Sequence, residues 1–186
     1  MVNGPRPVGR FSHAVTVVGS KLFVFGGRTD GGHLNDMWAF DLNSRTIAHR
    51  CFEPSDPIFL AVNSNPVWNS YEPAPGDKKP PPRAGHVLVT TGDRIILFVS
   101  LSPSSSPLVI ILCRFGGADR PKWYNDTWSF DVSTGEWTEL RCTGCVPSPR
   151  SGHTASLVDD IMYVFGGLDD DRPVLDDLIA LKLSSK

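Results

Sequence analysis

Arg10-Phe11-Ser12-His13 begins a stretch that runs through an apolar segment to Gly26-Gly27, and the same pattern occurs three times in this 186-residue chain. The second copy runs from Arg83-Ala84-Gly85-His86 to Gly116-Gly117, and the third from Arg150-Ser151-Gly152-His153 to Gly166-Gly167. Residues that recur at equivalent positions of an internal repeat are first of all candidates for an architectural role. The repeat therefore predicts that these residues build the fold.

Each copy contains the pattern of a β-hairpin. The His is followed six residues later by a turn pair, Gly19-Ser20, Gly92-Asp93 or Asp159-Asp160. Six residues make one strand, and Gly or Asp pairs suit a tight turn. The runs Leu22–Phe25 and Ile161–Phe165 are β-branched and aromatic without polar alternation, which predicts second strands covered on both faces.

Tryptophan marks the next two strands. Asn35–Asp41 and Asn125–Asp131 predict third strands in which Trp38 and Trp128 share a face with the Phe two residues later. Trp68 and Trp137 predict fourth strands. The last copy continues as Asp177–Leu183 without Trp and reaches Lys186 before any fourth strand. The fold class predicted is all-β, with about three four-stranded antiparallel units, the last incomplete.

Four strands per unit, Gly-Gly after the second and Trp on the fourth resemble the kelch repeat, whose blades form a β-propeller. The resemblance implies a partial kelch propeller over residues 1–186, with blade 1 at about 6–73, blade 2 at about 83–142 and an incomplete blade 3 at about 150–186. The glycines are expected to let backbones approach closely, the Trp and Phe to fill the space between blades, and the Arg and His to tie strands and loops together. The structural repeat positions are Arg10, His13, Gly26, Gly27, Trp38, Arg83, His86, Gly116, Gly117, Trp128, Trp137, Arg150, His153, Gly166 and Gly167.

Two segments do not fit the repeat. The spacing from turn to Gly-Gly is 7 residues in the first and third copies but 24 in the second, an excess of 17. Removing residues 98–114 restores Ile-Ile-Leu-Phe-Gly-Gly, and about 16 surplus residues lie near 45–61 in the first copy. Our hypothesis is that both are retained introns, while genuine insertion into loops is the alternative.

Composition excludes charge-driven partners. A net charge of -2 without long runs of one sign gives no basic surplus for nucleic acid or anionic lipid. The sequence has no apolar segment long enough to span a bilayer and no secretory signal at its start, so we expect no membrane insertion and a cytoplasmic location. Four cysteines at irregular spacing agree with a reducing compartment.

Candidates for metal or redox chemistry are weak. Cys142-Thr143-Gly144-Cys145 has the spacing of half a zinc site or a redox pair, but no second pair completes it. Asp169-Asp170-Asp171 is more typical of a solvated loop than of a calcium site. A galactose-oxidase-like copper site would need two Tyr, two His and a Cys, whereas most His here are repeat positions. We therefore expect no catalytic residue, metal or cofactor.

Surface recognition is the remaining class of function. The loops after each Gly-Gly, 28–34, 118–124 and 168–175, are equivalent in position and different in content, as binding loops on a rigid scaffold are. Trp123 either anchors a partner or folds back onto its blade. The proline-rich segment 73–82 is explained as a connector between blades, with an SH3-type ligand as the alternative. The partner-binding candidates are Arg28, Asp30, His33, Arg120, Lys122, Trp123, Tyr124, Asp170 and Arg172.

Among kelch proteins, the sequence is similar to the fungal cell-end marker family of the tip-elongation-aberrant type. The similarity is carried by residues 11–14, 22–27, 35–42, 71–75, 81–89, 125–131 and 147–167. It implies a non-enzymatic scaffold for cell polarity at growing tips and the cortex, with protein partners that include other kelch polarity proteins. Oligomerisation is then expected through a coiled coil, for which these residues contain no heptads. A substrate-recognition propeller of a ubiquitin ligase is the alternative, although no BTB or F-box segment occurs in these 186 residues.

Overall fold

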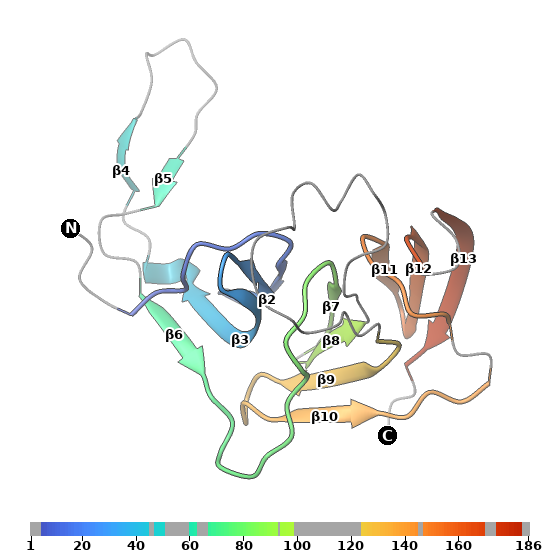
Figure 1. Ribbon diagram of the computed structural model, residues 1–186. Coiled ribbons are helices and arrows are strands. Elements are labelled where there is room, and N and C mark those ends of the chain that lie inside the picture. Colours follow the sequence, from blue (N-terminus) through green and yellow to red (C-terminus); the bar gives the residue numbers. More distant parts are fainter. Residues whose placement is uncertain are drawn as a thin grey trace.

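Three antiparallel sheets follow one another along the chain in a fan (Figure 1), and we refer to them as blades 1, 2 and 3. The computed structural model describes residues 5–44, 47–50, 60–62, 67–92, 94–98, 124–144, 147–169 and 174–183. Blade 1 has the order β1 (Ala14–Val18), β2 (Lys21–Thr29), β3 (Gly32–Asp41) and β6 (Trp68–Tyr71). Blade 2 contains β7 (Val87–Thr91), β8 (Arg94–Phe98), β9 (Thr127–Asp131) and β10 (Trp137–Leu140), and blade 3 contains β11 (Thr154–Val158), β12 (Ile161–Gly167) and β13 (Leu175–Lys182). The prediction of an all-β fold with a last unit of three strands is confirmed.

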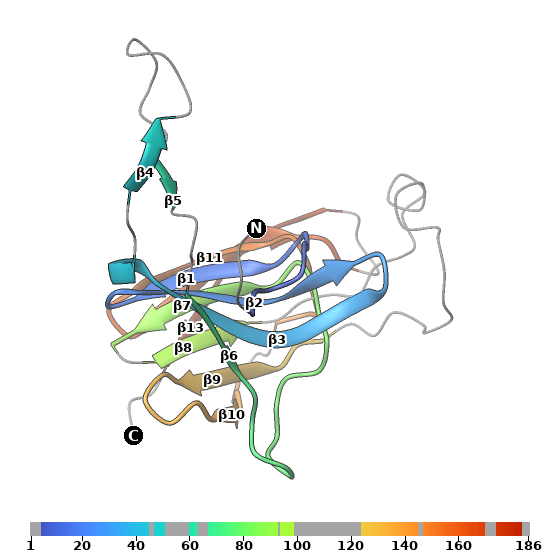
Figure 2. The same cartoon turned by 90° about the vertical axis from the view of Figure 1, so that its left-hand side faces the viewer.

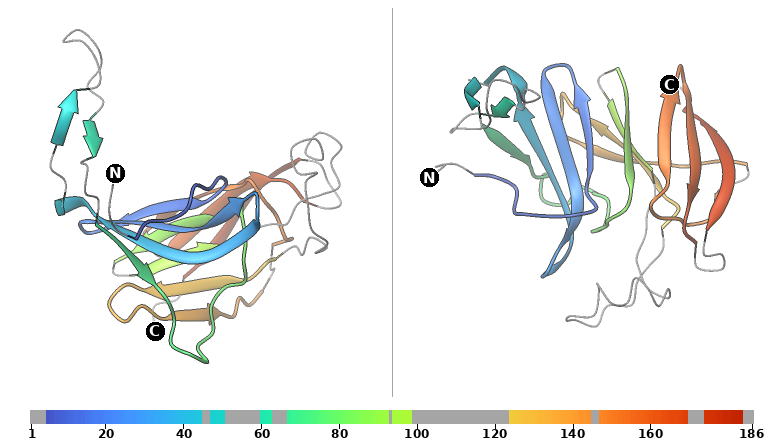
Figure 3. Two further views of the ribbon diagram at one scale, coloured as in Figure 1. Left: turned by 60° about the vertical axis from the view of Figure 1, so that its left-hand side comes forward. Right: turned by 90° about the horizontal axis from the view of Figure 1, so that it is seen from above.

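The blades stack face to face, and their first strands lie side by side. Strand β7 contacts β1 on one side and β11 on the other, so the first strands form the inner edge of the array (Figures 2 and 3). Short turns join the first and second strands of blades 1 and 3, because Val18 pairs with Lys21 and Val158 with Ile161. The tight hairpins predicted at these two sites are therefore confirmed. No helix among the described residues is both long and apolar enough to cross a membrane.

The segment 28–34 differs from the sequence expectation of a loop. Strands β2 and β3 continue through it, with Arg28 paired to His33 and Thr29 to Gly32, which leaves only Asp30-Gly31 as the turn. Neither Asp30 nor Gly31 has a positive φ, and the positive φ of +128° falls on Gly32, where glycine carries no steric cost. The chain therefore reverses without leaving the ladder. The expectation of a loop here was wrong, and the segment is a hairpin.

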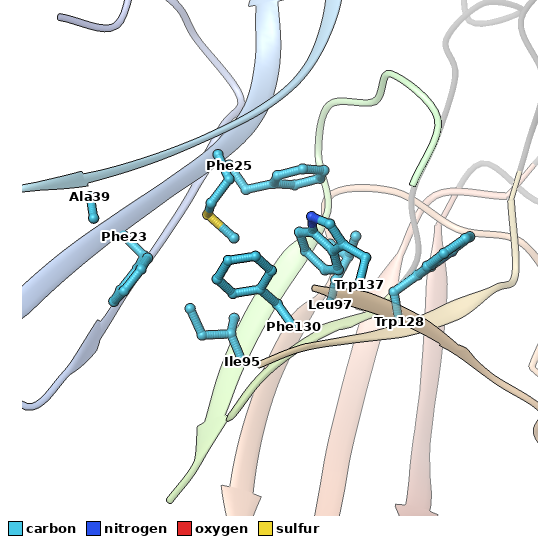
Figure 4. Close-up of a cluster of buried hydrophobic side chains, with 9 residues drawn as sticks. Phe23, Phe25, Ala39, Ile95, Leu97, Trp128, Phe130 and Trp137 are labelled. Atoms are coloured by element: carbon cyan, nitrogen blue, oxygen red, sulfur yellow. The ribbon is translucent and has the colours of Figure 1, made fainter. Parts of the chain in front are cut away.

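The core between blades 1 and 2 is aromatic (Figure 4). Phe25 of β2 lies 4.9 Å from Trp137 of β10 between ring centroids, and Trp137 lies 4.9 Å from Phe130 of β9. Burying a side chain of this size contributes roughly 1.5–3 kcal/mol each. The complete cluster is Phe23, Phe25, Met37, Ala39, Ile95, Leu97, Trp128, Phe130 and Trp137.

Blades 2 and 3 share a smaller aliphatic core, in which Val89 and Ile96 pack on Met162 and Val164. The expectation that Ile161–Phe165 is covered on both faces was wrong. Met162 and Val164 are fully buried, whereas Phe165 is 54% exposed. The reason is that a strand is covered on both faces only when a blade packs on each side, and the described residues place a blade on one side of β12 only.

The two surplus segments leave the blades at different places. The first includes β4 (Ile47–Arg50) and β5 (Leu60–Val62), which pair with each other and project away from blade 1 (Figure 1). The second segment interrupts the end of β8, where Phe98 pairs with Val87 and Thr127. Phe98 thus takes the place in blade 2 that Phe25 takes in blade 1, where Phe25 pairs with Ala14 and Met37.

Candidate functional site

An ion pair between a buried Arg and a partly exposed Asp stands at the start of every blade. The first Arg of the blade donates two hydrogen bonds to one Asp carboxylate: Arg10 to Asp36 at 2.6 and 2.8 Å, Arg83 to Asp126 at 2.7 and 2.8 Å, and Arg150 to Asp177 at 2.7 and 2.8 Å. The Arg side chains are at most 4% exposed, whereas the Asp side chains range from 18% to 46%. Sequence reasoning missed these Asp partners, although each lies two residues before an equivalent third-strand position, which is occupied by Trp38, Trp128 or Ile179.

The rest of each guanidinium binds backbone. In blades 1 and 3, Nη1 donates to the carbonyl of the first Gly of the pair, Gly26 at 3.0 Å and Gly166 at 3.1 Å. Nε donates to the carbonyl two residues earlier in the chain, as from Arg83 to Pro81 at 3.1 Å. A planar guanidinium with five donors suits this task, which a lysine ammonium cannot perform. The Arg therefore fixes the blade start to the end of the second strand.

The indole of the third strand completes the site in blades 1 and 2. Trp38 Nε1 donates to Asp36 at 2.7 Å, and Trp128 Nε1 donates to Asp126 at 2.7 Å. Burial by itself raises the pKa of Asp126, but the hydrogen bonds from Arg83 and Trp128 outweigh burial and hold this pKa below its ordinary value. The carboxylate therefore stays charged and paired.

The Gly-Gly pair allows the next blade to approach. Gly26 has φ of +58°, and a Cβ there would lie 2.9 Å from the Arg83 carbonyl oxygen and 2.9 Å from His86 Cε1. The Gly27 amide donates to the Arg83 carbonyl at 2.8 Å, and the Arg83 amide donates to the Leu34 carbonyl at 2.9 Å. No other residue fits this conformation in the space available.

Histidine links one blade to the next. His86 Nε2 lies 3.1 Å from the Phe25 carbonyl oxygen, and the His86 side chain is buried. Burial, together with the charge of Arg83, lowers the pKa of His86 to about 3. His153 is equally buried in blade 3, whereas His13 at the equivalent position of blade 1 is exposed.

Backbone hydrogen bonds also run from blade to blade near the inner edge. The Gly85 amide donates to the Ser12 carbonyl at 2.9 Å, and the Gly152 amide donates to the Gly85 carbonyl at 3.0 Å. All three residues have positive φ, at +52° for Ser12, +68° for Gly85 and +66° for Gly152. The tetrapeptide that begins each blade is thus a repeated connector with one left-handed position.

Three of the candidate binding residues lie on the β2–β3 hairpin, and a fourth, Tyr124, stacks on Arg83. Arg28 and His33 face each other at the base of the β2–β3 hairpin, and Asp30 is exposed at its tip. Burial and the charge of Arg28 lower the pKa of His33. Tyr124 packs over its own blade, with Arg83 Cζ 4.7 Å from the ring centroid. Arg120, Lys122, Trp123, Asp170 and Arg172 lie outside the described residues, as do Gly116 and Gly117 of the repeat.

Comparison with known families agrees with this geometry. The family described as Kelch motif matches residues 9–46, and the KLHDC2/KLHL20/DRC7 Kelch-repeats domain matches residues 108–186. The chain contains kelch repeats. Kelch repeats are protein-interaction modules, so this chain carries such a module.

The curated relatives that this chain matches are far longer than the chain itself. It is 28% identical over 184 residues to acyl-CoA-binding domain-containing protein 6 of Oryza sativa subsp. japonica, covering 99% of this chain and 24% of that protein. It is 28% identical to human host cell factor 1, over 89% of this chain and 7% of the relative. It is 29% identical to the flagellar outer-arm dynein alpha chain of Chlamydomonas reinhardtii, over 88% of this chain and 3% of the relative. The chain spans about a quarter or less of each relative, and the three names differ widely.

The metal and redox candidates fall only partly within the described residues. Across the ranges that the structure describes, no three His, Cys, Asp or Glu side chains come together as metal ligands. Cys142 Sγ lies 3.3 Å from Thr127 Oγ1, and Cys145 lies outside the described residues. The charged groups that do converge are the Arg–Asp pairs, whose Arg side chains are buried and bonded to backbone carbonyls, which indicates a structural role.

Proposed function

We propose that this chain is a non-enzymatic scaffold that binds protein partners through the end of the blades where second strands meet third strands. The observation that carries the proposal is a difference in exposure between neighbouring charged residues at this end of blade 1. Arg10 is buried and bound to Asp36 by two hydrogen bonds, while the adjoining hairpin carries Asp30 into solvent. Surface residues held on a rigid frame are the usual place for recognition.

The hairpin has the properties of a preorganised binding element. Its strands pair through Thr29 and Gly32, and the Thr29 hydroxyl accepts a hydrogen bond from the Gly31 amide at 3.1 Å. Its base is held by neighbouring chain, because Asn35 Nδ2 donates to the Pro80 carbonyl at 3.0 Å and Pro80 is buried. A loop fixed in this way loses little conformational entropy on binding, which favours affinity. The connector role of the proline-rich segment 73–82 fits the same contact.

We also propose a cellular setting, the growing tips and cortex of fungal cells, where the partners include other kelch polarity proteins. This part rests on the similarity of residues 11–14, 35–42 and 81–89 to the fungal cell-end marker family. The comparisons with known proteins support the kelch module, and the cellular role is tested by experiment.

The experiment places the fluorescently tagged chain in a filamentous fungus, beside two double variants. Arg28→Glu with Asp30→Lys reverses both charges of the hairpin. Glu139→Lys with Arg141→Glu makes the same exchange on the exposed end of blade 2 and is the matched control. We expect tip accumulation of the unsubstituted chain and the control, and loss of accumulation for the hairpin variant at an unchanged melting temperature. Diffuse signal from the unsubstituted chain would overturn the polarity role, and tip retention by the hairpin variant would overturn the binding surface.

A further inference from the structure

The open face of blade 3 repeats the face that blade 1 uses to bind blade 2. Matching the two strand registers makes Phe165 equivalent to Phe25 and Leu178 equivalent to Met37. Phe25 and Met37 are 0% and 1% exposed, whereas Phe165 and Leu178 are 54% and 65% exposed. By the same register Tyr163 corresponds to Phe23 and Ala180 to Ala39. Blade 3 therefore carries an inter-blade face without a blade on it among the described residues.

The polar groups of the inter-blade contact are repeated as well. Between blades 1 and 2 they are the Phe25 carbonyl, which pairs with His86, the Gly27 amide and the Leu34 carbonyl. The equivalent groups on blade 3 are the Phe165 carbonyl, the Gly167 amide and the Leu175 carbonyl, because Gly167 pairs with Leu175 as Gly27 pairs with Leu34. Gly167 has φ of +102°, close to the +95° of Gly27, so the backbone there has the same form.

Blade 1 carries the complementary face at the other end of the array. Its Val15, Trp38 and Trp68 are equivalent to Leu88, Trp128 and Trp137, the residues that blade 2 directs towards blade 1. Trp128 and Trp137 are 5% and 8% exposed, whereas Trp38 and Trp68 are only half-buried and Val15 is 46% exposed. His13 is exposed where His86 is buried, so the histidine that would enter a preceding blade is available.

We propose that two copies of this chain associate head to tail, with blade 3 of each copy packed on blade 1 of the other. His13 of one copy then binds the Phe165 carbonyl of its partner, and the Gly167 amide of the partner binds the Arg10 carbonyl. Contacts of this kind close into a ring when the rotation between blades permits. Two copies contribute six blades, within the four to eight that propellers contain.

The partner on these open faces is a second copy, because the contact between blade 3 and blade 1 would repeat the contact that blades 1 and 2 make within one chain. Both halves of the blade 1–blade 2 contact recur on this one chain, one half at each open end, with hydrophobic side chains opposite hydrophobic side chains and donors opposite acceptors. An unrelated partner has no reason to match both halves. This contact uses the blade faces and needs no coiled coil.

The test is the mass of the 186-residue chain in solution, measured by sedimentation equilibrium across concentrations, for four proteins. Phe165→Asp places a charge on the face of blade 3, and Val15→Asp places one on the face of blade 1. Thr138→Asp adds the same charge to the exposed outer strand of blade 2, away from both open faces, and is the control. All three substituted residues are exposed, Val15 at 46% and Phe165 at 54%, so the folded monomer is expected to tolerate the changes.

We expect the unsubstituted chain and the Thr138→Asp control to have twice the mass of one chain, and each face variant alone to be monomeric. Mixing Phe165→Asp with Val15→Asp is expected to restore a dimer, because each variant retains the face that the other needs. A Val15→Asp dimer would show contact between two blade 3 faces and overturn the proposal. An unsubstituted chain that is monomeric at all concentrations, or that forms only irregular aggregates, would also overturn it and point to blades supplied from elsewhere.

Discussion

His86 of blade 2 donates a hydrogen bond from Nε2 to the carbonyl oxygen of Phe25 in blade 1, at 3.1 Å. Because a carbonyl only accepts, the ring must carry its proton on Nε2, and burial with a pKa of about 3 keeps it neutral. Phe25 and His86 lie 61 residues apart in sequence, so one side chain joins two blades. The contact between blades therefore depends on the protonation state of this histidine.

We expect the protein to lose stability on acidification already at pH values above those at which carboxylates titrate. The pKa of His86 falls from 6.5 in the unfolded chain to about 3 in the folded one. The contribution of neutral His86 to the free energy of unfolding is therefore complete above pH 6.5 and is lost as pH falls towards 3. The expected loss of unfolding free energy between pH 8 and pH 5 is on the order of 2 kcal/mol. Urea unfolding at several pH values measures it.

His86→Gln keeps a side-chain N–H donor and removes the titration, so its stability should change less over the same pH range. In the monomeric Val15→Asp background, His13→Gln is the matched control, because His13 is the equivalent residue and is exposed in the single chain. It should leave the pH dependence of that background unchanged. Equal pH dependence in the two variants would show that His86 is not the group responsible.

The Arg–Asp pair of blade 2 should contribute more to stability than that of blade 3. Arg83→Met leaves Asp126, 18% exposed, without its partner, and breaking a buried pair costs about 3–5 kcal/mol. Arg150→Met should cost less, because Asp177 is 46% exposed and water can solvate it. Urea unfolding compares the two variants, and equal losses would contradict the burial argument.

A methyl group at Gly26 should cost more than the same change at a free turn. Gly26→Ala combines a left-handed φ with approach to 2.9 Å of the Arg83 carbonyl, whereas Gly19 has a similar φ of +56° and no atom within 4 Å. Gly19→Ala should lose about 1–2 kcal/mol from conformation alone. Gly26→Ala should lose at least about 1 kcal/mol more through overpacking between blades. Thermal unfolding of both variants tests this, and similar melting temperatures would count against a close inter-blade contact.

Ser12 is expected to be a strained position that glycine relieves. Its φ of +52° matches Gly85 and Gly152 in the other blades, which occupy this conformation without a Cβ. Ser12→Gly should therefore raise the unfolding free energy by up to about 1 kcal/mol, the relief being partly offset by a more flexible unfolded chain. Ser12→Ala retains the strain and is the control, so stabilisation by alanine would refute this explanation.

The surplus segment of blade 2 should be dispensable. Because residues 98 and 115 are both Phe, removing 98–114 or 99–115 gives one and the same chain, in which Gly116-Gly117 directly follows the Phe of β8. We expect this deletion to unfold at least as cooperatively as the intact chain. Removing 100–116 instead leaves Val99 before Gly117 and should be destabilised.

The intron hypothesis has a separate measurement. A spliced transcript is expected to lack the codons for 98–114 and 45–61. A transcript that retains both segments would contradict the hypothesis and leave loop insertion as the explanation.

Several elements could be predicted from the sequence because their signals are local. The apolar runs after His13 and His153, the turns at residues 19–20 and 159–160, and the Trp on the fourth strands are all confirmed as parts of strands and turns. The expectation of a loop at 28–34 was wrong because ladder pairing extends past Gly27, and polar composition alone does not reveal pairing. The Asp partners of the arginines were missed because each lies 26 to 43 residues from its Arg in the chain.

The sequence by itself determined the number and order of strands in the three blades, since each of these strands and turns depends on residues within one repeat. Only the tertiary structure decided that His86 is buried and neutral while His13 is exposed, and that Phe25 is enclosed while Phe165 faces solvent. These pairs have the same residue type at the same repeat position. They differ because burial and electrostatics depend on whether another blade packs against the residue, and that neighbour lies far away in the chain.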